Sequence, residues 1–163
     1  MLLNDGGNMK RKIFGLFFIM FFSLYPYIPA CRPITGMCRI TGYKIRGNQV
    51  FESEIPIVKE IIEILNNSLG ENVKIKIVGH TDNLESLQKM KLSRARALET
   101  YNLMKEYGLR EDIEVEIIGV GSSEAISDNS TEVGRYQNRR VEILFDTISL
   151  RKSLWKFNVG GLE

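Results

Sequence analysis

The side chains best suited to binding or catalysis gather in four short segments of the chain. Most of these segments are expected at the ends of regular elements, and groups on loops held by a rigid sheet can converge in space although they are far apart in sequence. We therefore expect them to form one site. The segments are Gly79-His80-Thr81-Asp82, Leu92-Ser93-Arg94-Ala95-Arg96-Ala97, Gly134-Arg135 and Asn138-Arg139-Arg140-Val141.

The residues around Asp82 do not have the composition of a metal site or of a nucleophilic relay. His80 is the one histidine of the chain, and a metal needs roughly three or four His, Cys, Asp or Glu ligands, so we expect no metal and no other cofactor. No GxSxG segment marks a nucleophile elbow. We expect His80 to have a structural or hydrogen-bonding role and the protein not to be an enzyme. The alternative is a periplasmic hydrolase that uses His80 and Asp82.

Asp82 is expected to act as a fixed anion that is paired with a cation at a strand end. The simplest partner is Arg96 or Arg139 of the same molecule, because a planar guanidinium fits a carboxylate. In the other interpretation Asp82 accepts hydrogen bonds from an ammonium group while Arg96 holds a carboxylate nearby, so that the pair binds the zwitterionic head of an amino acid. Each charge-assisted bond of this kind contributes roughly 1.5 to 3 kcal/mol.

Hydrophobic periodicity predicts the elements that position these groups. Apolar residues recur at helical spacing in two segments and alternate with charged residues in others. The expected helices span 54–69 and 87–107, and the expected strands span 43–46, 73–77, 113–117 and 141–145. The order β-α-β-α-β-β predicts an α/β fold of the α+β kind, a two-layer sandwich with the helices on one face of a mixed sheet. The long polar loop at 119–138 is a candidate rim for the site.

The first 30 residues have the pattern of an export signal. A basic cluster at 10–12 precedes an apolar run from Ile13 to Leu24, which has 12 residues and is too short to span a membrane. We therefore predict that residues 1–30 are a signal peptide, and translation from Met9 would give the more regular signal.

The segment that follows the signal contains both cysteines of the chain. Ile28-Pro29-Ala30-Cys31 resembles a lipobox, which predicts lipidation of Cys31 and attachment to a membrane. A disulfide between Cys31 and Cys38 is the second interpretation, and an uncleaved anchor is the third. Residues 31–42 are otherwise predicted to be a linker, because they contain proline and glycine and no helical pattern.

The charge balance argues against a nucleic-acid partner. The chain has 22 Lys and Arg against 20 Asp and Glu, a net charge of +2, which is too nearly balanced to neutralise a phosphate backbone. Any recognition of charge must therefore be local.

The motifs in this order resemble the OmpA-like peptidoglycan-binding domain, which also occurs in peptidoglycan-associated lipoproteins and in flagellar stator proteins of the MotB type. The resemblance covers about 43–145, and the domain that it implies spans 43–146. It depends on GHTD at 79–82, LSRARA at 92–97, Gly-Val-Gly at 119–121 and GR followed by NRRVEI at 134–143. The tail at 147–163 extends past the family's core, and packing on the domain, a membrane or partner contact and disorder are all open for it.

The resemblance implies a non-catalytic domain that binds the bacterial cell wall noncovalently. Asp82 would take the ammonium and Arg96 the carboxylate at the free end of a diaminopimelate side chain in the stem peptide, while Arg140 would be structural. The other pocket residues that the resemblance implies are Thr81, Asn83, Asn138 and Arg139. This chain departs from the family's usual pattern in two places: the loop after Asp82 has no glycine, and Lys89 stands where asparagine is usual.

The signal, the lipobox-like segment and the single domain together resemble a peptidoglycan-associated lipoprotein. This implies a protein that is lipid-anchored on the periplasmic face of the outer membrane and tethers that membrane to peptidoglycan. A contact with Tol-type envelope proteins is an analogy that no residue of this chain specifies. A degenerate OmpA-like domain that serves protein contacts is a further alternative.

Overall fold

The computed structural model describes residues 31–32, 35–70, 73–85 and 88–146. These residues form a five-stranded sheet with three α-helices and a short 3-10 helix. The strands are β1 (Cys31–Arg32), β2 (Met37–Thr41), β3 (Lys74–Gly79), β4 (Glu114–Gly119) and β5 (Arg140–Phe145). The helices are η2 (Glu52–Glu54), α2 (Ile55–Ser68), α3 (Lys89–Glu106) and α4 (Glu132–Asn138).

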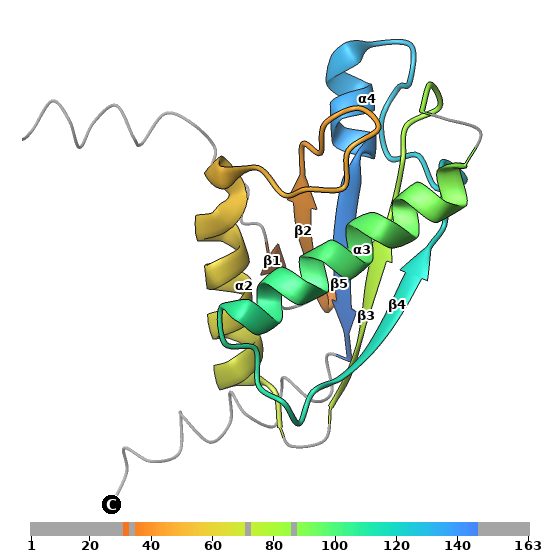
Figure 1. Cartoon of the computed structure of the whole chain (residues 1–163). Helices are drawn as coiled ribbons and strands as arrows, with labels where there is room; N and C mark the ends of the chain where they lie inside the picture. Colours follow the sequence, from red (N-terminus) through yellow and green to blue (C-terminus); the bar gives the residue numbers. More distant parts are fainter. Residues whose placement is uncertain (1–30, 33–34, 71–72, 86–87, 147–163) are drawn as a thin grey trace, which may run out of the picture.

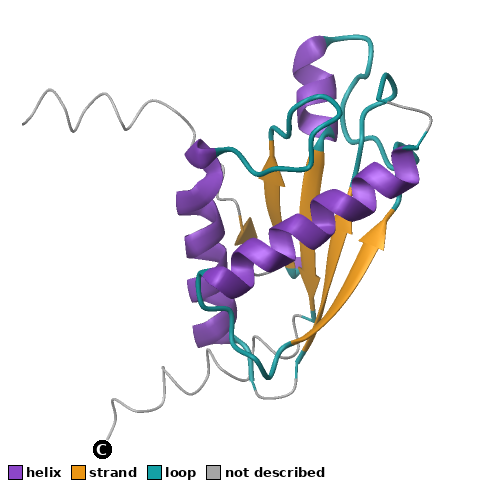
Figure 2. Ribbon diagram, in the orientation of Figure 1, coloured by secondary structure: helices purple, strands orange, loops and turns teal. Residues whose placement is uncertain are grey.

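The sheet is mixed and has the strand order β1-β2-β5-β3-β4. β3 and β4 are parallel and are connected through α3, whereas all other neighbouring strands are antiparallel. Figure 1 shows α2 and α3 on one face of the sheet, and α4 at the end where β3 and β4 finish. The same two layers are visible in Figure 2. The predicted two-layer sandwich is therefore confirmed.

The core lies between the sheet and its two long helices. α2 buries Val58, Ile61 and Leu65 completely, at the spacing of a single helical face. Ile77 of β3 and Ile143 of β5 are also fully buried and are opposite each other in the antiparallel ladder. Each such side chain contributes about 1.5–3 kcal/mol of burial free energy, so this layer holds the helices on the sheet.

α3 approaches the sheet closely because two glycines leave room for its backbone. A Cβ atom at Gly79 would overlap the carbonyl oxygen of Ser93, and one at Gly119 would lie 2.5 Å from the backbone nitrogen of Arg94. The two glycines end β3 and β4 and are Cα partners in the parallel ladder. The first half of α3, which carries Arg96, is therefore held directly over the ends of these strands.

The folded domain begins further upstream than the sequence pattern predicts. Residues 43–46 were expected as a strand but form a loop and a turn, and the predicted linker at 31–42 contains β1 and β2. β2 does have the period of a strand, since Cys38 and Ile40 are buried between less buried neighbours. Arg39 lies on the less buried face of the strand, where it forms an ion pair with a glutamate of β5 at 3.0 Å.

The polar segment at 119–138 is not wholly a loop, because it contains α4. Thr131 caps this helix by accepting a hydrogen bond from the backbone N–H of Gly134 at 3.0 Å. The helix has seven residues, and its Val133 is exposed, so it leaves no periodic apolar face in the sequence.

Cys31 and Cys38 are joined by a disulfide in this structure. They are Cα partners across β1 and β2, and both are buried. This arrangement is the second of the interpretations given for the cysteines. A sulfur atom in a disulfide cannot also carry a lipid, so lipidation of Cys31 requires a molecule without this bond. The lipid anchor stays a prediction.

Two predictions concern segments outside the described residues. These are the signal peptide at 1–30 and the tail at 147–163. Within the described ranges, none of the helices combines the length and the hydrophobicity that a membrane span requires.

Candidate functional site

Asp82 lies just after β3, and its carboxylate is fixed by three hydrogen bonds. Oδ1 accepts from the backbone N–H groups of Leu84 at 2.8 Å and Glu85 at 2.9 Å. Oδ2 accepts from Nη1 of Arg139 at 2.7 Å. Because the side chain is only 1% exposed, its charge depends on these donors rather than on water.

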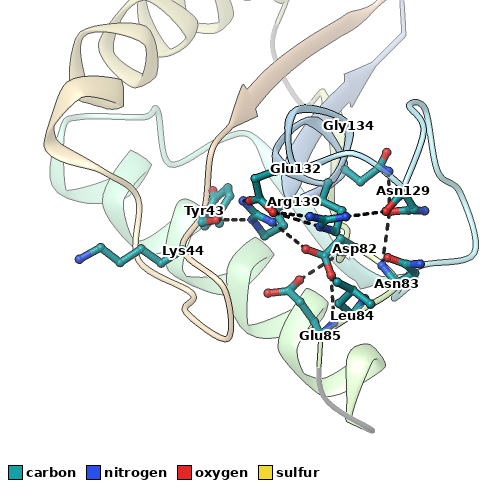
Figure 3. A network of polar contacts seen from close by, with 12 residues as sticks. Tyr43, Lys44, Asp82, Asn83, Leu84, Glu85, Asn129, Glu132, Gly134 and Arg139 are labelled. Carbon is teal, nitrogen blue, oxygen red and sulfur yellow. Dashed lines mark hydrogen bonds and ion pairs between the residues drawn. The ribbon is translucent and has the colours of Figure 1, made fainter.

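Arg139 connects Asp82 to two other parts of the domain, as Figure 3 shows. Its Nε donates to the carbonyl oxygen of Tyr43 at 2.9 Å, and its Nη2 donates to Oε1 of Glu132 in α4 at 2.8 Å. Burial lowers the pKa of Arg139, but its hydrogen bonds to Asp82 and Glu132 outweigh burial and raise the pKa above its ordinary value. The hydrogen bonds from Arg139 and Arg135 lower the pKa of Glu132. The Arg139–Glu132 pair is therefore ionised at neutral pH.

Arg96 is fully buried in α3 and uses all of its donors within the protein. Nε donates to the carbonyl oxygen of Gly47, Nη1 to that of His80 and Nη2 to that of Lys44, each at 2.9 Å. The remaining N–H groups bind the carboxylate of Glu85, from Nη1 to Oε2 at 2.7 Å and from Nη2 to Oε1 at 2.6 Å. Neither side chain of the pair is exposed. This is the bidentate geometry that guanidinium and carboxylate groups favour.

Glu85 joins the two halves of the site. Its Oε2 accepts from the backbone N–H of Asp82 at 3.2 Å as well as from Arg96. Its Oε1 accepts from the backbone N–H of Arg46 at 2.8 Å and from Arg96. Four hydrogen bonds use the acceptor capacity of an ionised carboxylate. Glu85 therefore contacts both the backbone of Asp82 and the guanidinium of Arg96. The side chain of Asp82 forms its ion pair with Arg139, whereas that of Arg96 forms its ion pair with Glu85.

Of the two intramolecular partners expected for Asp82, the structure has Arg139. The partner of Arg96 is Glu85, which the sequence motifs did not single out. A signal for Glu85 was present, because it is the one acidic residue between Asp82 and Arg96. For Asp82 and Arg96 to hold the two ends of one zwitterion, a ligand carboxylate must take the position that Glu85 occupies here.

The other predicted pocket residues have different surroundings. Thr81 is buried, and its Oγ1 has no hydrogen-bond partner among the described residues. Asn83 is exposed. Asn138 is fully buried: its Oδ1 accepts from two backbone N–H groups of the loop at 126–129, and its Nδ2 donates to two oxygens of that loop. Asn138 therefore fixes the shape of this loop.

Lys89 opens α3 and contacts the loop after Asp82. Its Nζ donates to the carbonyl oxygen of Asn83 at 2.8 Å. Lys89 thus links the start of the helix to this loop through a backbone carbonyl group. It forms no ion pair with the carboxylates of Asp82 or Glu85 described above.

His80 and Asp82 do not form a relay within the described part of the chain. His80 is buried, its Nε2 lies 3.6 Å from Oε2 of Glu142, and neither ring nitrogen has a hydrogen-bond partner among the described residues. Burial raises the pKa of Glu142, but His80 and Arg140 outweigh burial and lower it to about 2. The described residues also include no group of three or more His, Cys, Asp or Glu that could hold a metal ion.

Three exposed apolar side chains and a hollow lie in the segments that supply the buried network. Ile45, Leu84 and Val133 are exposed by 57%, 65% and 71%, and they lie in the three segments that supply Arg46, Glu85 and Glu132 to the network. A hollow of about 510 Å³ is lined by Lys44 and residues 47–53. Lys44 and Gly47 line the hollow, and their carbonyl groups accept from the guanidinium of Arg96, which is not itself among the lining residues.

Fold and site together define a small α/β domain with a buried network of acids and guanidinium groups at one end of its sheet. The model of the OmpA family matches residues 46–139, which is more than half of the 163 residues. The chain therefore belongs to the OmpA family.

One curated protein and two solved structures are similar to this chain. The chain is 38% identical over 72 residues to the outer-membrane lipoprotein YfiB of Pseudomonas aeruginosa, a match that covers 44% of this chain and 42% of the relative. The peptidoglycan-associated lipoprotein from Burkholderia pseudomallei has a similar structure, with a TM-score of 0.59, 16% identity and coverage of 75% of this chain and 100% of that chain. The cell wall anchor of the T6SS from Pseudomonas aeruginosa has a TM-score of 0.52 at 28% identity, covering 67% of this chain and 80% of that chain. The chain thus spans less than half the length of the curated lipoprotein that it matches.

Proposed function

We propose that this domain binds peptidoglycan noncovalently and anchors an envelope component to the cell wall without catalysing a reaction. The observation that carries the proposal is the buried carboxylate of Asp82, which is fixed by three donors. It is connected to the guanidinium of Arg96 through Glu85, which accepts from the backbone N–H of Asp82 and from Arg96. Family membership supports it, and so do the names of the relatives, an outer-membrane lipoprotein, a peptidoglycan-associated lipoprotein and a cell wall anchor.

The proposed ligand group is the free end of a diaminopimelate-type side chain, which carries an ammonium and a carboxylate. The ammonium binds at Asp82 and the carboxylate at Arg96. Thr81 offers a hydroxyl group that has no partner among the described residues, and Asn83 lies exposed on the same loop. Arg139 holds Asp82 in place. In this arrangement the ligand is selected by charges of both signs rather than by a net field.

The proposed location is the periplasmic face of the outer membrane. An acyl anchor at Cys31 belongs to this proposal for molecules in which Cys31 is not bonded to Cys38. A contact with Tol-type proteins stays a prediction, since none of the described contacts specifies it.

A second candidate function is contact with other envelope proteins through a vestigial pocket. It is favoured by one observation, the ion pairs that Asp82 and Arg96 already make with Arg139 and Glu85. A hydrolase that uses His80 and Asp82 is less compatible with the geometry, because these side chains face different partners.

Incubation of the purified full chain with purified diaminopimelate-type sacculi distinguishes the three candidates. The wall-binding proposal predicts that the chain sediments with the sacculi and releases no soluble fragments. Fragment release that is abolished by His80→Ala would identify a hydrolase. If the folded chain stays in the supernatant, wall binding fails and the protein-contact candidate is left.

A further inference from the structure

The ligand binding proposed above gives no role to Glu85. Its carboxylate nevertheless occupies the position on the guanidinium of Arg96 that the ligand carboxylate needs. Both of its oxygens are bonded to the fork of Arg96, at 2.6 and 2.7 Å, and the side chains of both residues are fully buried. Backbone N–H groups of Asp82 and Arg46 complete its four hydrogen bonds. A ligand carboxylate cannot bind the same edge of Arg96 while Glu85 is there.

We propose that Glu85 is a built-in competitor for the ligand carboxylate, so that it sets both the affinity of the site and its preference for the ligand's anionic end. This inference depends on the proposed function. Peptidoglycan then binds Arg96 only in molecules in which Glu85 has left the fork.

The competition is strong because Glu85 is part of the same chain. A tethered group acts at an effective concentration of the order of millimolar or more, whereas a ligand must be supplied from solution. Apparent affinity falls by the fraction of molecules that are competent to bind, so a fork that is free in about 1–10% of molecules weakens binding about tenfold to a hundredfold.

The displaced carboxylate also has a place in the bound state. Glu85 lies next to Asp82 in the chain's loop, bonded to its backbone N–H. When a ligand carboxylate takes Arg96, Glu85 loses its counter-charge, and the ligand's ammonium is the cation that compensates the acids of the site. A ligand with both an ammonium and a carboxylate supplies a counter-charge for the acids and for Arg96. A ligand with an ammonium alone leaves Arg96 without a counter-charge once Glu85 has left, so the exchange favours the zwitterionic end group.

The test compares wild type with Glu85→Gln in binding to two kinds of sacculi, one with diaminopimelate and one with lysine in the stem peptide. The lysine wall keeps the ammonium and lacks the carboxylate. We expect Glu85→Gln to bind the diaminopimelate wall about tenfold or more tightly than wild type, with no gain on the lysine wall. Glu63→Gln is the matched control, because Glu63 is exposed on α2, and it should bind like wild type.

Glu85→Gln also removes the counter-charge of a buried arginine, so its folding must be measured by thermal unfolding with and without sacculi-derived muropeptides. Glu85→Asp is the second variant, since it keeps the charge but draws the carboxylate back from the fork by one methylene. It should show the same gain to a smaller extent. If wild type binds and both variants bind equally or more weakly, Glu85 is a structural partner of Arg96 and the inference is wrong, while wall binding stands. If neither wild type nor the folded variants bind either wall, the proposed function and the inference fall together.

Discussion

Replacing Arg96 tests whether the buried network holds the end of the domain together. Arg96→Met keeps the aliphatic part of the side chain and removes the guanidinium. The carboxylate of Glu85 then stays buried with only its two backbone donors, and the carbonyl groups of Gly47 and His80 lose the donor that Arg96 supplies. The carbonyl group of Lys44 keeps only the backbone N–H of Gly47. Breaking a buried ion pair in this way costs about 3–5 kcal/mol of unfolding free energy. This is a large share of the roughly 5–15 kcal/mol of a typical domain.

Urea unfolding of the purified full chain measures this cost, and a double-mutant cycle with Glu85→Gln assigns it to the pair. The double variant should be more stable than the sum of the single effects predicts, with a coupling free energy of about 0.5–3 kcal/mol. Arg94→Met is the matched control on the same helix. Arg94 is exposed and makes a hydrogen bond to the carbonyl oxygen of Ile117, so its loss should cost about 1 kcal/mol or less. Equal effects of Arg94→Met and Arg96→Met, or strict additivity in the cycle, would show that the Arg96–Glu85 pair does not hold this end of the domain together.

Three further predictions concern the packing, the acid stability and the cysteines. Gly79→Ala should lower the unfolding free energy by about 3 kcal/mol or more in urea, because its methyl group overlaps the carbonyl of Ser93; an unchanged midpoint would contradict the packing. The pKa of Glu142 is lowered from 4.5 to about 2 in the folded state, so its stabilisation, up to roughly 3 kcal/mol, is present above about pH 4.5 and is lost as the pH falls towards 2. Glu142→Gln should reduce the loss of unfolding free energy between about pH 4.5 and pH 2. An unchanged pH dependence of the unfolding free energy in this range would count against the interaction of Glu142 with His80 and Arg140. The intact mass of the isolated protein should correspond to a Cys31–Cys38 disulfide and change on reduction; an acyl mass on Cys31, or no change on reduction, would contradict this bond.

The long elements could be predicted from the sequence because their periodicity follows from burial on one side. α2 and α3 lie within the predicted ranges 54–69 and 87–107, and β3 to β5 overlap the three predicted strands. β2 was not predicted, because Pro33, Gly36 and Gly42 around it favoured a linker and its alternation covers only five residues. α4 could not be predicted either, since its seven residues depend on a cap and on ion pairs rather than on an apolar face.

The sequence singled out part of the buried network and offered Arg139 as one of two partners for Asp82, but it gave no indication that Arg96 pairs with Glu85. Asp82, Arg96 and Arg139 could be singled out because their charge types and motif order suit recognition of both signs. Their partners depend on tertiary geometry: Asp82 pairs with Arg139 across 57 residues of sequence, and Arg96 pairs with Glu85. Glu85 lies in the loop that departs from the family's pattern, where the resemblance offers no guidance.

The most direct test of the central claim is calorimetric titration of the full chain with a diaminopimelate-containing muropeptide. Asp82→Asn keeps the shape of the side chain and removes its charge, and Asp112→Asn makes the same change at an exposed position. The account predicts that wild type and Asp112→Asn bind alike, and that folded Asp82→Asn loses about tenfold or more in affinity, which corresponds to one charge-assisted bond. Asp82→Asn that is folded and binds with wild-type affinity would contradict the claim that this carboxylate holds the ligand.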